Sequence, residues 1–441
     1  MAKGSFKTPA YLFAWYLANP AKPVLIGEVE SLTNGDQTLK YAASWLESGF
    51  PISDDMPLTA QKYSPRHRRE RLPGVPGALD DSLPDRWGEK VIRYLYKRGA
   101  TIRDNLYFSG DDRFGAIGIS DSDAQYRPFN LRPLPRLSDV EELGAAAAII
   151  ESGTGELAEH RVKLISAGGS LGGAKPKAVI TIEGDEWVVK FFNGEPWDQP
   201  LIEHACLTMA LKAQINVAQS RIIKMKAENA IAIKRFDRAA GQRIHSISAS
   251  TLIRAATPAG QVPQYGYPHL ARRLRVTADI NRLDEHLEDL FRRMVFNILI
   301  GNTDDHEKNH AVTYEIQGGV PVVNLSKAYD VVTTGSGSTV HEFMIADDVV
   351  DPDLDAAVSV HNDFGLEEMR ARVIMSDVIL VVDQWKTIFA GLGVTEADIE
   401  RLEEFIDADH LLEQRNKHRV PAKVSPKASR TAIRRTPKIF K

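Results

Sequence analysis

One short polar stretch organises this sequence: Gly301-Asn302-Thr303-Asp304-Asp305-His306-Glu307-Lys308-Asn309. It follows directly on the clearest helical pattern of the chain, in which apolar residues recur at helical spacing from Leu287 to Leu299. Gly301 is the kind of residue that commonly ends a helix. The pattern therefore predicts a polar loop held on the end of a long, buried helix.

Two side chains of this loop suit phosphoryl transfer. Asp304 and Asn309 lie five positions apart, so a rigid loop can hold one proton acceptor and one metal-binding oxygen together. Asp330 ends a later apolar stretch, where a second carboxylate for magnesium is expected. A solvated run of charges is the alternative interpretation of the loop.

Two other residues of the loop are harder to interpret. His306 is predicted to have a structural hydrogen-bonding role, with metal ligand and general base as alternatives. Asp305 stands in a crowd of charges that should repel one another unless a cation or ligand offsets them. The sequence suggests no role for Asp305.

A second group of residues, upstream, would suit a nucleotide. Residues 167–177 include four glycines, which let the backbone approach an anion, and end in Lys177. Lys190 ends an apolar strand, where it could hold phosphates, and Glu203 on the next helix could hold the lysine. Phe236 closes the last strand, where a base could stack. A surface loop, a solvent-facing lysine and a core aromatic are the structural alternatives.

The pattern around these residues predicts an ordered set of strands and helices. Strands at 178–182 and 186–191 should form a hairpin around Glu183-Gly184-Asp185. A helix at 199–213 and strands at 220–225 and 230–236 should follow, before the chain becomes mainly helical from 263. Nearer the N-terminus we expect strands at 12–17, 24–27 and 114–119 and a helix at 86–97.

Composition limits the class of protein. The chain has 441 residues, of which 43% are hydrophobic, and its single cysteine, Cys206, excludes an intramolecular disulfide framework. There is no signal-peptide pattern and no apolar run long enough to cross a membrane, so we expect a soluble cytoplasmic protein. The net charge is −4, yet the segment from Gln414 to Lys441 holds ten Lys and Arg and no acidic residue. We expect this basic tail to be disordered.

Together these segments resemble the HipA-type serine/threonine kinases, the toxin halves of bacterial toxin–antitoxin pairs. The resemblance runs from about residue 12 to about residue 415 and rests most on four motifs, Ser170-Leu171-Gly172-Gly173-Ala174-Lys175-Pro176-Lys177, Arg235-Phe236-Asp237-Arg238, Asn302 to Asn309, and Tyr329-Asp330. It implies an α+β, protein-kinase-like fold with a β-rich N-lobe and a mainly helical C-lobe. The implied parts are a HipA N-terminal subdomain at 1–135, an N-lobe at 136–240, a C-lobe at 241–413 and a tail at 414–441.

The resemblance also implies roles for single residues. Asp304 would be the catalytic base, and Asn309 and Asp330 would hold Mg²⁺. The ATP-binding residues would be Gly172, Gly173, Lys177, Lys190, Lys234 and Phe236, the last two as a hinge that meets adenine largely through backbone groups. Ser170 would be autophosphorylated, which would switch the enzyme off. At Asp305 the chain departs from the family, which usually has a small residue there.

The implied partners are a HipB-like helix-turn-helix antitoxin, DNA reached indirectly through it, and a protein substrate such as an aminoacyl-tRNA synthetase. ATP and Mg²⁺ are the implied cofactors, and no membrane is expected. One alternative is a catalytically weak kinase fold that serves as a corepressor with the antitoxin. Another is a metal-dependent hydrolase that uses Asp304, Asp305, His306 and Asp330.

Overall fold

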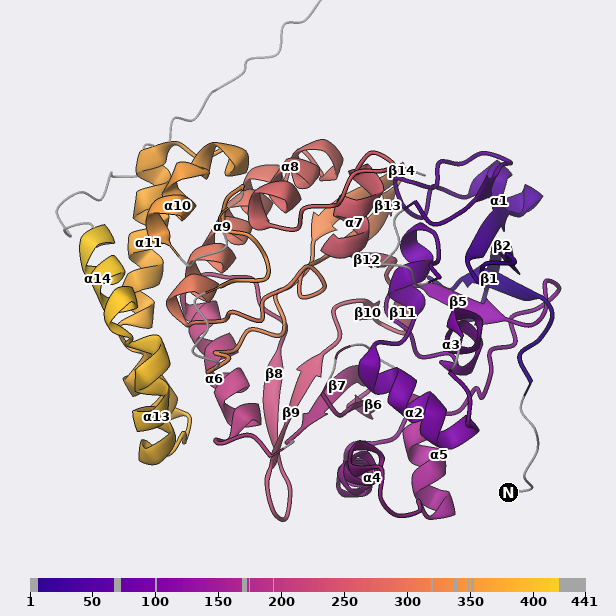
Figure 1. Ribbon diagram of the computed structural model, residues 1–441, viewed down its shortest axis with the longest axis horizontal. Coiled ribbons are helices and arrows are strands. Elements are labelled where there is room, and N and C mark those ends of the chain that lie inside the picture. The colour runs from indigo at the N-terminus through magenta and orange to yellow at the C-terminus, as the bar shows by residue number, and fades with distance from the viewer. Residues whose placement is uncertain are drawn as a thin grey trace, which may run out of the picture.

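The computed structural model describes residues 7–66, 73–99, 101–168, 173, 175–192, 194–318, 320–335, 340–347, 349 and 353–419. Figure 1 shows a β-rich N-terminal part on one side, a small sheet in the centre and a mass of helices on the other side. Within the described residues, no helix is long and apolar enough to cross a membrane.

The N-terminal part is built on a five-stranded antiparallel sheet. Its strand order is β4-β3-β2-β1-β5, from Lys62–Tyr63, Gln37–Tyr41, Val24–Ser31, Leu12–Tyr16 and Ile117–Ser120. Helices α1 (Ala43–Ser48), η1 (Gly77–Ser82), α2 (Arg86–Tyr96) and α3 (Ile102–Phe108) complete it. The expected strand at 114–119 begins only at Ile117, because the Gly115 N–H donates to the Asp237 carboxylate instead of to a neighbouring strand.

The central sheet has the predicted elements in the predicted order. Strands β6 (Lys177–Ile182), β7 (Asp185–Phe191), β9 (Asn229–Lys234) and β8 (Ser220–Lys224) pair antiparallel in that spatial order. Helix α6 (Gln199–Lys212) connects β7 to β8 and begins at Asp198, whose carboxylate accepts the Leu201 N–H. At the hairpin turn Glu183 and Gly184 both have positive φ, +54° and +88°, as a tight two-residue turn requires.

Two helices that we did not expect cover one face of this sheet. They are α4 (Val140–Ser152) and α5 (Glu159–Gly168), and the short helix η2 (Leu137–Asp139) precedes them. They share a hydrophobic cluster with the sheet and with α2, to which Trp87, Val91, Leu143, Ile180 and Phe191 belong. Helix α2 therefore packs over the central sheet although its sequence belongs to the N-terminal part.

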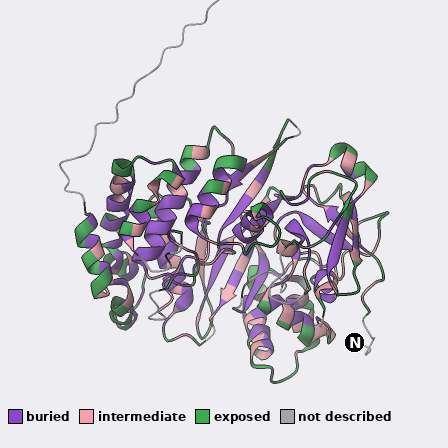
Figure 2. Cartoon of the chain, turned by 45° about the horizontal axis from the view of Figure 1, so that its top comes forward, coloured by how far each residue is buried: buried purple, intermediate pink, exposed green. Residues whose placement is uncertain are grey.

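The remaining chain is mainly helical and surrounds α9 (Leu283–Leu299), whose apolar stripe is buried as predicted. Figure 2 shows buried residues running through the helical mass with exposed residues on its outside. The other helices are α7 (Ala249–Ala256), α8 (Tyr267–Thr277), α10 (Leu354–Ser359), η3 (His361–Phe364), α11 (Glu368–Val382), α12 (Trp385–Gly391), α13 (Glu396–Ile406) and α14 (Asp409–His418).

Two small sheets accompany these helices. Strands β12 (Ser246–Ser248), β13 (Ala311–Gln317) and β14 (Val320–Leu325) form one, and β10 (Arg238–Ala239) and β11 (Gln242–Arg243) form the other. β14 lies at an edge of the three-stranded sheet, a position that suits Pro321, since proline has no backbone N–H for a second neighbour.

The basic tail begins later than the sequence suggested. Helix α14 continues to His418 and so includes the first five residues of the segment that we expected to be disordered from Gln414. The reason is Arg415, whose buried guanidinium binds the Asp407 carboxylate and the Ile406 carbonyl. Residues 420–441 lie outside the described part of the chain.

A buried charge cluster joins the N-terminal part to the central sheet. The Arg235 guanidinium, just after β9, pairs with the carboxylates of Asp112 and Asp237 and donates to the Arg113 carbonyl at 2.6 Å. Burial alone would raise the pKa of Asp237, but Arg235 and Arg238 outweigh it and hold that pKa well below its ordinary value. The Arg-Phe-Asp-Arg motif thus has a structural function at this joint.

We predict that Arg235→Leu lowers the free energy of unfolding by about 3–5 kcal/mol, because it leaves buried carboxylates without their main partner. Urea denaturation measures this change. The control is Arg372→Leu on α11, where the exposed ion pair with Glu368 should contribute less than about 0.5 kcal/mol. Equal losses in the two variants would contradict a special role for the joint.

Candidate active site

The polar loop after α9 is fixed by its own hydrogen bonds. Gly301 has φ +62° and turns the chain out of the helix, as predicted. The Asn302 N–H then donates to the Asn297 carbonyl at 2.9 Å. His306 takes part in the loop itself, because its Nδ1 accepts the Lys308 N–H at 3.2 Å and its carbonyl accepts the Asn309 N–H at 2.9 Å.

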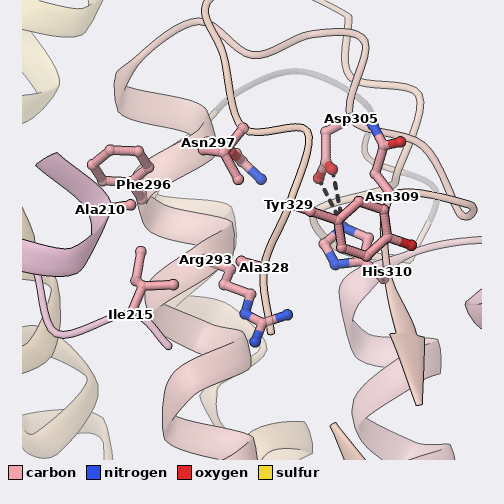
Figure 3. Close-up of a pocket in the computed structure, with 11 residues that line it drawn as sticks. Ala210, Ile215, Arg293, Phe296, Asn297, Asp305, Asn309, His310, Ala328 and Tyr329 are labelled. Atoms are coloured by element: carbon pink, nitrogen blue, oxygen red, sulfur yellow. Dashed lines mark hydrogen bonds and ion pairs between the residues drawn. The ribbon is translucent and has the colours of Figure 1, made fainter. Parts of the chain in front are cut away.

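The Asp305 side chain points into the protein and anchors the loop to the interior. Its buried carboxylate accepts a hydrogen bond from the Tyr267 hydroxyl. It also accepts one from His310 Nε2 at 3.0 Å, and Figure 3 shows this contact. Burial would raise the pKa of Asp305, but His310 and Tyr267 together hold it below its ordinary value. His310 follows Asp305 by five positions, but Tyr267 comes from α8, 38 positions earlier, so the local sequence contains only one of the two partners.

Asp304 has the opposite environment to its neighbour. Asp304 is exposed to solvent. The pKa of Asp304 is raised above its ordinary value, mainly because its carboxylate is partly buried. His306 lowers this pKa and Asp330 raises it. The Asn309 side chain is buried, and its Nδ2 donates to the Asp304 carbonyl at 3.2 Å. That bond uses the amide nitrogen, so the amide oxygen is the atom left to meet a metal ion.

Lys190 forms ion pairs with both Glu203 and Asp330, which lie far apart in the sequence. Its ammonium lies 2.7 Å from Glu203 Oε1 on α6 and 2.6 Å from Asp330 Oδ1. Burial would lower the pKa of Lys190, but Asp330 and Glu203 raise it above its ordinary value. Lys190 likewise holds the pKa of Asp330 low against the effect of burial. Three predicted residues from separate elements therefore form one charged group.

Lys177 is buried beside this group, opposite Lys190 in the register of β6 and β7. Burial and the neighbouring Lys190 lower the pKa of Lys177 to about 8. Gly173 lies above it with φ +103°, and a Cβ at that position would stand 2.0 Å from Lys177 Nζ. A side chain at Gly173 would therefore be strained and would displace the lysine. Ser170 and Gly172 lie outside the described residues.

The two predicted hinge residues differ in position. Phe236 packs against the Tyr329 ring, with ring centres 5.3 Å apart, and Tyr329 directly precedes Asp330 in the chain. Lys234 instead pairs through its ammonium with Asp185 at the start of β7, and its N–H donates to the Gln219 carbonyl. The structure thus does not bring the Lys234 side chain to the other site residues.

The donor atoms fit magnesium. Asn309 offers an amide oxygen and Asp330 a carboxylate, and hard oxygen ligands of this kind, completed by phosphates, are what Mg²⁺ prefers. In the described part of the chain, no three His, Cys, Asp or Glu side chains are grouped to hold a metal ion. A magnesium site completed by the phosphates of a nucleotide needs no such group.

A small sheet with a lysine–glutamate pair, set over a helical lobe that carries a polar Asp and Asn loop, is the architecture of the two-lobed protein kinases. The α+β fold expected from the sequence is confirmed. The chain matches the HipA-like C-terminal domain over residues 169–385 and the HipA N-terminal domain over residues 21–120. It therefore belongs to the HipA family of kinases, as its motifs predicted.

Similar proteins cover most of the chain. The serine/threonine-protein kinase toxin HipA of Shewanella oneidensis is 23% identical over 367 residues, which are 75% of this chain and 78% of that protein. Y4dM of Sinorhizobium fredii is 29% identical over 275 residues, which are 58% of this chain and 60% of that protein. A chain of the Shewanella oneidensis complex of HipA, HipB and operator DNA has the same fold, with TM-score 0.65 and 18% identity over 92% of this chain and 97% of that one.

The two neighbouring aspartates should respond differently to mutation. We predict that Asp305→Ala lowers the free energy of unfolding by about 3–5 kcal/mol, because His310 and Tyr267 lose a buried anion. The exposed Asp304→Ala should change it by no more than about 0.5 kcal/mol. Urea denaturation of both variants measures this contrast, and equal effects would show that Asp305 is no anchor.

Lys177 should make stability depend on pH. In the folded protein the pKa of Lys177 is about 8, whereas that of a free lysine is 10.5. Between these two pH values the unfolded chain therefore binds more protons at Lys177 than the folded protein does. Wild type should therefore gain stability relative to Lys177→Met as the pH rises from about 8 to about 10. Urea denaturation across this range measures the gain, and a constant difference would contradict the lowered pKa.

Proposed function

We propose that this chain is an ATP- and Mg²⁺-dependent serine/threonine protein kinase that acts as a growth-inhibiting toxin. The observation that carries the proposal is the Lys190 ammonium between Glu203 and Asp330, facing a loop with an exposed Asp304. A lysine fixed by a helix glutamate, next to a metal-binding aspartate, is the arrangement that phosphoryl transfer requires.

Each residue then has a task in the reaction. The Asp304 carboxylate accepts the proton of the substrate hydroxyl, for which its exposure and raised pKa suit it. Lys190 and Lys177 bind phosphate oxygens, and Phe236 offers a face to the base. Asn309 and Asp330 hold magnesium, which neutralises charge on the phosphates when bound.

We propose in addition that Ser170 is the site of autophosphorylation. A phosphate there adds about −1.5 to −2 charge, three residues before Gly173, in a segment suited to phosphate oxygens. It would compete with ATP for the same amides and lysines. Phosphorylation would thus lower ATP affinity and switch the enzyme off.

One of the proposed partners has support from a solved structure with the same fold. The fold is shared with a chain of a complex that contains HipA, HipB and operator DNA, and this supports a HipB-like antitoxin that brings the kinase to DNA. We propose that the protein acts in the cytoplasm on a translation-related protein, such as an aminoacyl-tRNA synthetase. A catalytically weak kinase fold that serves as a corepressor with the antitoxin is the second candidate, and the same complex supports it.

We predict that Asp304→Ala lowers Mg²⁺-dependent phosphate transfer from labelled ATP by about 10²–10⁴-fold, because the proton acceptor is lost. Labelled protein bands in a cell extract, and mass spectrometry of Ser170, measure the transfer. The control is Asp284→Ala, an exposed acid in the first turn of α9, which should leave activity unchanged. Equal labelling by wild type and Asp304→Ala, or none by wild type, would favour the corepressor.

A further inference from the structure

Asp85 stands at the N-terminus of α2 but does not cap that helix. An aspartate in this position usually accepts a backbone N–H of its own first turn. Here the side chain makes no such bond, and both of its oxygens reach loops that lie far away in the sequence. These two contacts reach both sides of the candidate active site.

The first contact fixes the end of the glycine-rich segment. Asp85 Oδ2 accepts the Gly173 N–H at 2.7 Å, and the Trp87 N–H donates to the Gly173 carbonyl at 3.1 Å. Both backbone polar groups of Gly173 are therefore held by the first turn of α2. The Trp87 indole is fully buried and donates to the Lys177 carbonyl at 2.8 Å, which fixes the start of β6 as well.

The second contact fixes the catalytic loop. Asp85 Oδ1 lies 2.7 Å from the Lys308 ammonium, and both side chains are more than 70% buried. Lys308 directly precedes Asn309, and its carbonyl accepts the Tyr329 hydroxyl at 2.7 Å. Since Tyr329 precedes Asp330, this connection leads to both residues proposed to hold magnesium.

We infer that Asp85 is a positioning residue for phosphoryl transfer, which holds the glycine-rich segment at Gly173 and the catalytic loop at Lys308 in fixed relation to each other. The N-terminal part of the chain is then a component of the active site. The inference rests on the proposed kinase function. Burial would raise the pKa of Asp85, but Lys308 and the Gly173 N–H hold it below its ordinary value, so the group is ionised at neutral pH.

Three variants separate the two contacts. Asp85→Asn and Lys308→Met each remove the ion pair, while an asparagine oxygen can still accept the Gly173 N–H. Asp85→Ala removes both contacts. The matched control is Asp54→Asn, which breaks another ion pair between the N-terminal part and the helical lobe, to Arg273 on α8.

Steady-state kinetics with Mg-ATP give the first measurement. Asp85→Asn and Lys308→Met should lower kcat by about tenfold with KM for ATP near that of wild type, as expected for one lost charge-assisted hydrogen bond. Asp85→Ala should in addition raise KM for ATP by about tenfold. The double variant Asp85→Asn with Lys308→Met should be no worse than the worse single variant, because both remove the same contact.

Amide hydrogen exchange gives a second measurement that needs no catalysis. Exchange in residues 303–309 should be faster in all three variants, and exchange in 173–178 should be faster only in Asp85→Ala. The inference would be overturned if Asp85→Ala had the kcat and KM of wild type, whether or not its unfolding temperature was lower. Asp85 would then only attach the N-terminal part to the rest of the chain. If Asp85→Ala does not fold, Asp85→Asn and Lys308→Met decide the outcome through kcat and exchange in 303–309. An inactive wild type would refute the kinase proposal alone, and exchange would still test the positioning role.

Discussion

The active-site geometry depends on one buried cation. The Lys190 ammonium is almost removed from water, which is costly for a charge unless carboxylates replace the lost hydration. Glu203 and Asp330 do so, and they come from α6 and from the loop after β14. The electrostatic requirement of a single lysine thus fixes the central sheet, its helix and the helical lobe relative to one another. Asp330 reaches Lys190 from a left-handed backbone conformation, φ +56°, which the surrounding contacts must maintain.

Local pattern predicted the parts of the fold that local forces determine. The β6–β7 hairpin, α6 and α9 follow from alternation, helical spacing and turn residues, and each was expected close to its observed bounds. The pairing of Lys190 with Glu203 was also expected, because phosphoryl transfer uses residues of these types at such places in the chain, whereas the ion pair between Lys190 and Asp330 was not. Helices α4 and α5 were not expected. Their apolar residues make sense only against the face of a sheet that forms elsewhere.

The residues that sequence reasoning missed are those whose partners are distant. The sequence suggested no role for Asp305, yet its carboxylate is a buried anion that binds His310 close by and Tyr267, which lies 38 positions earlier. Asp85 directly precedes the helix expected at 86–97, and its two contacts lie 88 and 223 positions away. The expected contact of Lys234 with a nucleotide is largely through its backbone and stays a prediction, while its side chain pairs with Asp185 at the start of the neighbouring strand β7. A charge in a sequence shows that a partner is required, and only the fold shows which.

The same reasoning explains why the N-terminal part is joined to the kinase lobes by charges as well as by apolar packing. Apolar contacts are non-directional and tolerate small displacements, whereas a carboxylate that binds two donors in fixed directions does not. Arg235 fixes the N-terminal part at the end of β9, and Asp85 fixes it at Gly173 and Lys308. A domain attached in this way sets the distance between the glycine-rich segment and the catalytic loop, which is the distance on which phosphoryl transfer depends.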